Sequence, residues 1–265
     1  MKYRVIIAEL LLIIILFSFV GCGIDVEIDC VEYARFKDGY TVTVINSRDS
    51  DESLERIYVR DEINGRKVHR IGGYYEHINV LTNKYTKRVY FPWSITTYDI
   101  GLNFWDSELE YVFFTSASER INGSNSRSDS RKFVIPLVAH FDVLEDGKLG
   151  NSYFDMDYYE EYYLPANISY RFNYDGNPNK GYFLIDLLEN TGKLTKPPYD
   201  PTREGYVFTG WYKDSECTKQ WNFENDIVTI KFDEEGNRIY EEFCLYAKWE
   251  VEEKTQWEKL LDLFK

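Results

Sequence analysis

Residues 197–212 read PPYDPTREGYVFTGWY and predict a stiff turn that leads into a β-strand. The three prolines fix their own φ angles and bias the residues before them toward extended backbone. Gly205 then permits a bend that a residue with a Cβ atom would resist. From Tyr206 onward the side chains alternate between two faces, as in a strand. Gly210 interrupts this alternation and indicates a bulge or a close backbone approach.

Further motifs follow this stretch in a fixed order. Cys217 precedes Trp221-Asn222-Phe223, and the segment LYAKW closes the unit at 245–249. The combined pattern resembles the internalin-type B-repeat, also called the Listeria–Bacteroides repeat. The residues that carry the resemblance are Pro201, Arg203, Gly205, Tyr206, Phe208, Gly210, Trp211, Tyr212, Leu245, Tyr246, Ala247, Lys248 and Trp249.

This resemblance covers residues 166–250, about a third of the chain. It implies a small β-grasp-like module, with residues 168–174 as its first strand. The family is often found in surface proteins, and it carries no catalytic residues to transfer. We therefore expect the module to be structural or binding.

The composition favours β structure and limits the class of partner. Aromatic residues make up 17% of the 265 residues, including 23 tyrosines, and tyrosine is favoured in strands. The formal net charge of −14 argues against nucleic acid as a partner.

The N-terminus, residues 1–22, has the pattern of a lipoprotein signal peptide. Lys2 and Arg4 precede an apolar run from Leu10 to Val20 that is too short for a comfortable membrane span. Phe19-Val20-Gly21-Cys22 resembles a bacterial lipobox, in which Cys22 receives the lipid. This predicts a protein anchored by lipid to the extracellular face of the bacterial cell membrane. The alternatives are a plain signal peptide and a retained membrane anchor.

Residues 23–141 are predicted to form an N-terminal β region. Asp38-Gly39 and Asn64-Gly65 are turn pairs next to alternating apolar residues. The segment 54–114 resembles degenerate leucine-rich repeats of the BspA-like surface type, with a good match at Pro92, Ser94 and Ile95. Such repeats need about three stacked units to bury a core, and two or three are present. The alternative is an unrelated small β domain.

Two segments flank the predicted repeat. Residues 142–165 form an acidic connector, in which Asp155, Asp157, Glu160 and Glu161 lie among tyrosines. Clustered carboxylates of this kind can bind calcium. The central glycine of an EF-hand loop is missing, however, so a solvated linker is favoured. Residues 251–265 predict a short amphipathic helix that begins with a capping box at Thr255 and Glu258.

The cysteines and histidines give no support for a metal site or for catalysis. Cys30, Cys217 and Cys244 remain after Cys22, and either a Cys217–Cys244 disulfide or three free thiols is compatible with the sequence. The chain has no C-x-x-C, H-E-x-x-H or G-x-S-x-G motif and no phosphate-binding glycine loop. We therefore expect no enzyme activity, no metal and no cofactor.

The sequence as a whole predicts a mainly β, non-catalytic surface lipoprotein for adhesion or protein–protein interaction. Its expected partners are the membrane, through the N-terminal lipid, and a protein or glycan of a host or neighbouring cell. The alternative function is a glycan- or solute-binding surface lipoprotein, in which Trp93 and Trp105 stack on sugars.

Overall fold

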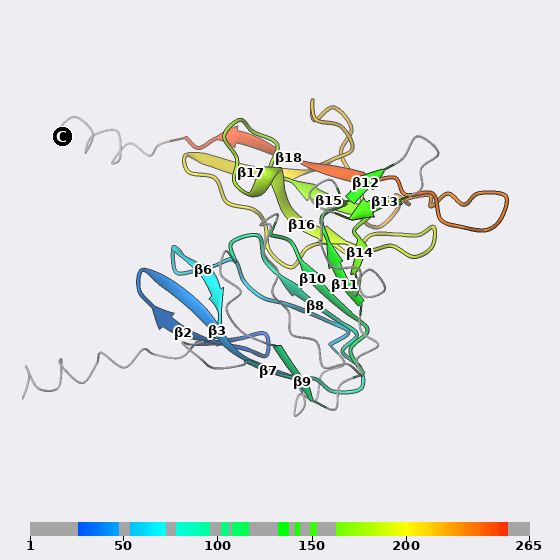
Figure 1. The fold of residues 1–265 in the computed structure, drawn as a ribbon. Helices are drawn as coiled ribbons and strands as arrows, with labels where there is room; N and C mark the ends of the chain where they lie inside the picture. The colour runs from blue at the N-terminus through cyan, green and yellow to red at the C-terminus, as the bar shows by residue number, and fades with distance from the viewer. Residues whose placement is uncertain are drawn as a thin grey trace, which may run out of the picture.

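The computed structural model describes residues 26–47, 54–72, 78–95, 102–105, 108–116, 132–137, 141–143, 149–152 and 163–253, with only the backbone at 102–105, 141–143, 149–152 and 163. These residues form a mainly β fold, as the sequence predicts, with sheets in three layers (Figure 1). The predicted lipobox, the C-terminal helix and most of the acidic connector lie outside the described residues.

The first layer is a sheet of hairpins and parallel strands. Its strands are β1 (Val26–Ile28), β2 (Val31–Phe36), β3 (Gly39–Asn46), β5 (Glu62–Ile63), β6 (Arg66–Ile71), β7 (Ile78–Leu81) and β9 (Leu102–Trp105). Both predicted turns are confirmed. Lys37 and Asp38 connect β2 to β3, and Asn64 and Gly65, both with positive φ, connect β5 to β6.

The middle layer is a sheet in which every neighbouring pair of strands is parallel. In spatial order its strands are β14 (Tyr163–Pro165), β11 (Lys132–Ile135), β10 (Tyr111–Phe114), β8 (Arg88–Phe91) and β4 (Arg56–Tyr58). The chain alternates between the first two layers through β7, β8, β9 and β10. Such stacking is what an array of repeats requires, but membership of the leucine-rich-repeat class stays a prediction.

The acidic connector contributes strands to this arrangement. Strand β14 comes from the end of that segment and extends the middle sheet to Pro165. Strands β12 (Phe141–Val143) and β13 (Leu149–Ser152) form an antiparallel hairpin. The segment is therefore not a linker over its whole length.

The third layer is the C-terminal sheet, with the order β16-β15-β18-β17. Its elements are β15 (Ile168–Arg171), the 3-10 helix η2 (Asn179–Gly181), β16 (Tyr182–Asp186), β17 (Tyr206–Tyr212) and β18 (Phe243–Val251). The predicted bulge is confirmed, because the register of β17 shifts between Phe208 and Gly210. Gly210 has a φ of 144°, and a Cβ atom there would lie 3.0 Å from the amide nitrogen of Gln220.

The middle sheet is buried on both faces because its side chains alternate. Val89 and Phe91 of β8 belong to the core shared with the first layer, whereas Tyr90 belongs to the core shared with the C-terminal sheet. Parallel register places aromatic rings directly above one another on the second face. The Tyr58 and Tyr90 rings stack at 4.3 Å, and the Tyr90 and Phe113 rings at 4.2 Å. Figure 1 shows the C-terminal sheet above this face.

One carboxylate joins the C-terminal sheet to the middle sheet. The Asp186 side chain, at the end of β16, is 9% exposed and lies 2.9 Å from Arg56 Nη1 and 3.1 Å from Arg88 Nη1. Its Oδ1 atom also accepts hydrogen bonds from the Tyr90 hydroxyl at 2.9 Å and from the backbone N–H of Leu187 at 2.8 Å. Burial and the charge of Asp186 raise the pKa of Tyr90 well above its usual range, so Tyr90 acts as a hydrogen-bond donor.

Replacing this carboxylate is expected to destabilise the fold strongly. Asp186→Ala leaves the largely buried Arg56 without its counter-ion and Arg88 with only the half-exposed Glu189 at 3.9 Å, and should lower the free energy of unfolding by about 3–5 kcal/mol. Urea unfolding monitored by circular dichroism measures the change. The control is Glu241→Ala, which removes an exposed ion pair with Lys231 and should cost about 1 kcal/mol or less. Equal losses in the two variants would contradict the central role of Asp186.

The fold is also expected to lose stability at alkaline pH. Burial and the hydrogen bond to Glu189 raise the pKa of Tyr111 to about 12, and burial raises the pKa values of Tyr170 and Tyr199 well above their usual range. An unfolded tyrosine titrates near 10. Above that pH the unfolded chain releases protons that the folded chain retains, so the free energy of unfolding falls as pH rises from about 10 to 12.

Urea midpoints at pH 8, 10 and 11 test this expectation. Tyr111→Phe retains the ring and removes one titrating hydroxyl, so its stability should decline less steeply with pH. A midpoint that does not change between pH 8 and 11 would show that the buried phenols do not control stability in this range.

Candidate functional site

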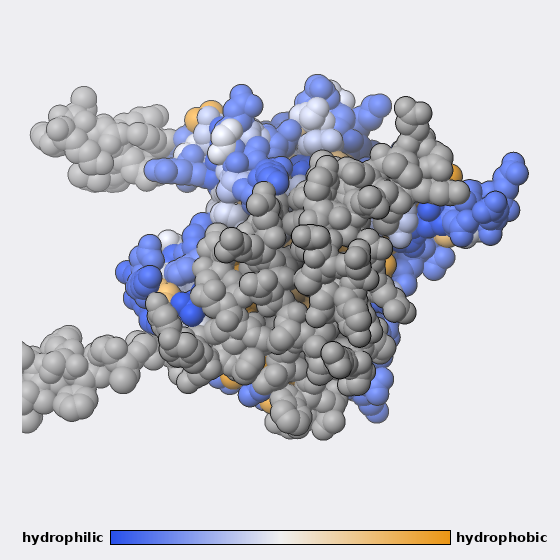
Figure 2. Space-filling model, viewed as in Figure 1, coloured by the Kyte–Doolittle hydropathy of each residue, from blue (hydrophilic) through white to orange (hydrophobic). Residues whose placement is uncertain are grey.

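A cleft of about 800 Å³ separates the β5–β6 hairpin from the C-terminal sheet. Figure 2 shows the molecule hollowed on the left of the view, between the upper lobe and the lower lobe. One wall comes from the N-terminal region and the other from the C-terminal sheet and the turn before β17. The lining residues are Glu62, Gly65, Lys67, Trp93, Phe172, Tyr174, Pro178, Pro201, Thr202, Arg203, Glu204, Gly205, Tyr206 and Glu252.

Trp93 forms the centre of the N-terminal wall. It follows β8 and is half-buried, and its Nε1 atom donates a hydrogen bond to Asp61 at 2.9 Å. The ring of Phe172 meets the Trp93 ring edge-on at 5.3 Å, so the two walls touch at the base of the cleft. The Lys67 ammonium lies 4.9 Å from the Trp93 ring centroid and 2.7 Å from Glu62. Trp93 is therefore held in position by contacts with both parts of the chain.

Arg203 forms the centre of the opposite wall. Its guanidinium carbon lies 3.6 Å from the ring centroid of Tyr206 and 4.4 Å from that of Tyr174. The turn is closed by the Tyr206 N–H, which donates to the Arg203 carbonyl at 3.1 Å, and Gly205 supplies the required φ of 74°. Neither an ion pair nor a hydrogen bond engages the Arg203 guanidinium among the described residues. Its donors are thus available to the cleft.

Comparison with known proteins identifies a family match for the segment that forms the C-terminal sheet. Residues 170–248 match the family described as the Listeria-Bacteroides repeat domain. This segment is a Listeria–Bacteroides repeat. The predicted repeat is thereby confirmed, and it supplies one wall of the cleft.

Two relatives from Evansella cellulosilytica share this part of the chain. One, named "Putative membrane protein", is 34% identical over 77 residues, which are 29% of this chain and 10% of the relative. The other, named "Putative Gly-rich membrane protein", is 32% identical over 77 residues, which are 29% of this chain and 8% of the relative. The match thus spans a tenth or less of these relatives. Within the described residues, no helix is long and apolar enough to cross a membrane.

The predicted signature residues of the repeat divide into two groups. Trp211, Leu245 and Ala247 are buried in its core, and Trp249 and Phe208 pack against that core. Tyr212 pairs with Tyr246 across the sheet, and Lys248 lies over the Tyr212 ring. The second group lines the cleft and consists of Pro201, Arg203, Gly205 and Tyr206. The turn before β17 therefore serves both the fold and the cleft.

Sequence reasoning named Trp93 and Arg203 but did not bring them together. Trp93 was predicted as an exposed platform for sugars, whereas it is half-buried at the junction of the two walls. The side chain of Trp105 lies outside the described part of the chain. Lys67 and Tyr174 were not identified as site residues, because nothing in their local sequence indicates that the β5–β6 hairpin and the repeat lie side by side.

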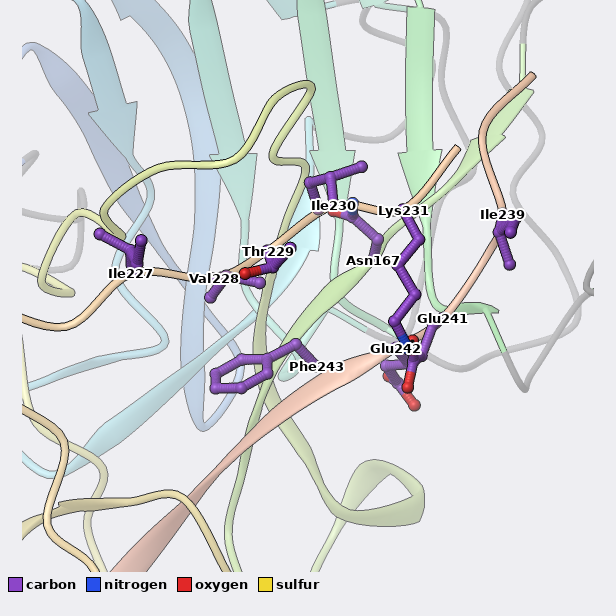
Figure 3. Close-up of a pocket in the computed structure, with 10 residues that line it drawn as sticks. All are labelled: Asn167, Ile227, Val228, Thr229, Ile230, Lys231, Ile239, Glu241, Glu242 and Phe243. Carbon is purple, nitrogen blue, oxygen red and sulfur yellow. Dashed lines mark hydrogen bonds and ion pairs between the residues drawn. The ribbon is translucent and has the colours of Figure 1, made fainter. Parts of the chain in front are cut away.

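A second, smaller hollow of about 300 Å³ lies where β18 begins (Figure 3). Its wall is formed by the extended segment 227–231 together with Ile239 and Phe243. Glu242, 10% exposed, pairs through Oε2 with Arg171 at 2.9 Å, while its buried Oε1 accepts no hydrogen bond from any described residue. Lys231 forms an ion pair with Glu241 beside it, at 2.6 Å. The hollow thus combines apolar side chains with the polar side chains of Asn167, Thr229, Lys231, Glu241 and Glu242.

The cysteines of the described region are free thiols, which decides between the two alternatives left open by the sequence. The Cys217 sulfur accepts a hydrogen bond from Asn173 at 3.3 Å, and burial raises the pKa of its thiol. The Cys244 sulfur accepts one from Ser169 at 3.3 Å. Across the described residues, no group of three His, Cys, Asp or Glu side chains could hold a metal ion.

Thiol labelling tests this arrangement. Alkylation in denaturant without a reductant, followed by peptide mass spectrometry, should modify Cys30, Cys217 and Cys244 completely. Native labelling of Cys217 should be slow at neutral pH, because burial favours the unreactive protonated thiol. A Cys217–Cys244 disulfide-linked peptide would contradict the structure.

Proposed function

We propose that this protein is a non-catalytic surface protein that binds a protein or glycan of a host or neighbouring cell in the cleft between its N-terminal region and its repeat. Lipid on Cys22 holds it at the extracellular face of the bacterial membrane. The repeat acts as a rigid structural module that also supplies one wall of the binding site.

The observation that carries this proposal is the composition of the cleft. It brings together the rings of Trp93, Tyr174 and Tyr206 with charged side chains from both parts of the chain. Ligand sites of about this size typically combine aromatic and apolar walls with a few polar groups that set orientation. The walls are connected through the buried Asp186 cluster, so the site is formed before a partner arrives.

The membrane location has independent support. The relatives from Evansella cellulosilytica carry the word membrane in their names, and the N-terminal sequence has a charged start, an apolar run and a lipobox-like ending. Two acyl chains on one cysteine would suffice for stable anchoring without a transmembrane helix.

Display on bacterial cells tests both parts of this function. Cells that express the full chain should incorporate labelled fatty acid into it, and Cys22→Ala should abolish that labelling. Adhesion of these cells to host-cell monolayers should be saturable. Tyr206→Ala should reduce adhesion at least about fivefold, because an aromatic contact in a desolvated site is typically worth about 1 kcal/mol or more.

Tyr85→Ala provides the matched control, because Tyr85 is 50% exposed and does not line the cleft. Surface abundance of each variant is measured by antibody binding. Adhesion that is equal for the parent and Tyr206→Ala at equal abundance would refute binding in the cleft. Absence of adhesion by the parent would refute the adhesion function itself.

A further inference from the structure

We propose that the cleft recognises a saccharide that carries a single carboxylate on an otherwise neutral body, a uronic acid unit, and that Arg203 binds this carboxylate. The inference rests on the proposed function, because it names the ligand class of the same cleft. It is carried by the geometry of Arg203 and by the distribution of charge around it.

Arg203 is pre-organised for a planar anion. Its guanidinium lies over the rings of Tyr206 and Tyr174, at 3.6 and 4.4 Å. Ring stacking uses the faces of a guanidinium and leaves its N–H donors at the edge, where they match the two oxygens of a carboxylate. Because the rings already restrict the side chain, binding costs less conformational entropy than it would for a free arginine.

Lys67, the second cation among the described residues that line the cleft, is already neutralised. Lys67 Nζ lies 2.7 Å from Glu62 and 4.0 Å from Asp61. Arg203, by contrast, has no carboxylate within ion-pair distance in the described part of the chain. A ligand with one negative charge therefore finds one available partner.

The surrounding acids limit the ligand to a low charge density. Glu62, Glu204 and Glu252 also line the cleft, and the chain carries a net charge of −14. A sulfated or phosphorylated polymer, or a strongly acidic peptide, would bring additional negative charges toward these carboxylates and be repelled. These same carboxylates can accept hydrogen bonds from hydroxyl groups, which a sugar supplies in number.

Aromatic side chains give the cleft apolar surface against which a sugar ring can pack. Trp93, Tyr174 and Tyr206 all contribute to the lining, and the volume of about 800 Å³ lies within the usual range of ligand sites, roughly 300–1,000 Å³. A uronate-containing oligosaccharide thus meets each feature of the cleft: rings, acceptors and one cation.

Calorimetry on the full-length chain in detergent micelles tests this inference with three short saccharides. A hyaluronan trisaccharide with one internal glucuronate carries a single carboxylate and no sulfate, chitotetraose is neutral, and a heparin tetrasaccharide is heavily sulfated. We expect the hyaluronan fragment to bind at least tenfold more tightly than the other two. Arg203→Gln should weaken that binding at least tenfold and leave the weak binding of chitotetraose unchanged.

Two further variants separate recognition from folding. Arg203→Lys retains the positive charge but loses the planar fork, so it should bind the hyaluronan fragment less tightly than the parent and more tightly than Arg203→Gln. It also provides the test if Arg203→Gln lowers the unfolding temperature. Arg35→Gln is the matched control, because Arg35 lies over the Tyr40 ring at 5.3 Å and does not line the cleft. Its affinity should equal that of the parent.

The remaining outcomes overturn the inference in distinguishable ways. Tighter binding of the heparin fragment would show that the cleft prefers polyanions. Equal affinity for chitotetraose and the hyaluronan fragment would show that Arg203 does not bind a carboxylate of the ligand. If no saccharide binds while cleft-dependent adhesion of displaying cells persists, the ligand class is wrong although the proposed function stands. If adhesion is also absent, both are wrong.

Discussion

The architecture depends on one buried carboxylate that faces two guanidinium groups. Removing Asp186, Arg56 and Arg88 from water is costly, and their mutual attraction offsets that cost only when the remaining hydrogen-bonding capacity is satisfied. Here the Asp186 carboxylate accepts bonds from both arginines, from the Tyr90 hydroxyl and from the Leu187 N–H, and Arg88 also donates to the Leu187 carbonyl at 2.8 Å. The cluster therefore fixes the angle at which the repeat meets the middle sheet. Because each part contributes one wall of the cleft, the shape of the cleft follows from the same contact.

The middle sheet can present such a cluster because its strands are parallel and in register. Arg56 of β4 pairs with Arg88 of β8, so two positive charges lie side by side at one edge of the buried face. The next residues, Ile57 and Val89, face the core shared with the first layer. The residues after them, Tyr58 and Tyr90, again face the C-terminal sheet, where their rings stack. Charge and aromatic stacking thus alternate with aliphatic packing at a period of two residues.

Local sequence signals predicted local structure well. The bend at Gly205, the bulge at Gly210 and the turn at Asn64-Gly65 each require a backbone that few residues adopt, so the residue type reveals the conformation. The repeat was identifiable for the same reason. Its aromatic signature, including Trp211, occupies a small core in which few other side chains would fit.

Long-range contacts were not predictable in this way. Asp186 ends an apolar strand, and a polar residue at the end of a strand is common. Arg56 and Arg88 lie far apart in the sequence, with several short strands between them. Only the topology brings the three together. The same holds for the cleft: Lys67 and Arg203 lie far apart in sequence, and neither carries a local signal for the other. The sequence suggested a binding role for Trp93 but did not predict the cleft, because an aromatic residue does not specify its neighbours.

The short passage from β14 to β15 has a mechanical consequence. Only Ala166 and Asn167 separate the two strands; the Ala166 N–H bonds to the Ile135 carbonyl at 2.8 Å, and the Asn167 amide bonds to both backbone groups of Leu188. The junction therefore contains no free loop that could extend under force. A pull applied between the N-terminal region and the repeat therefore loads the β11–β14 ladder and the Asp186 cluster directly.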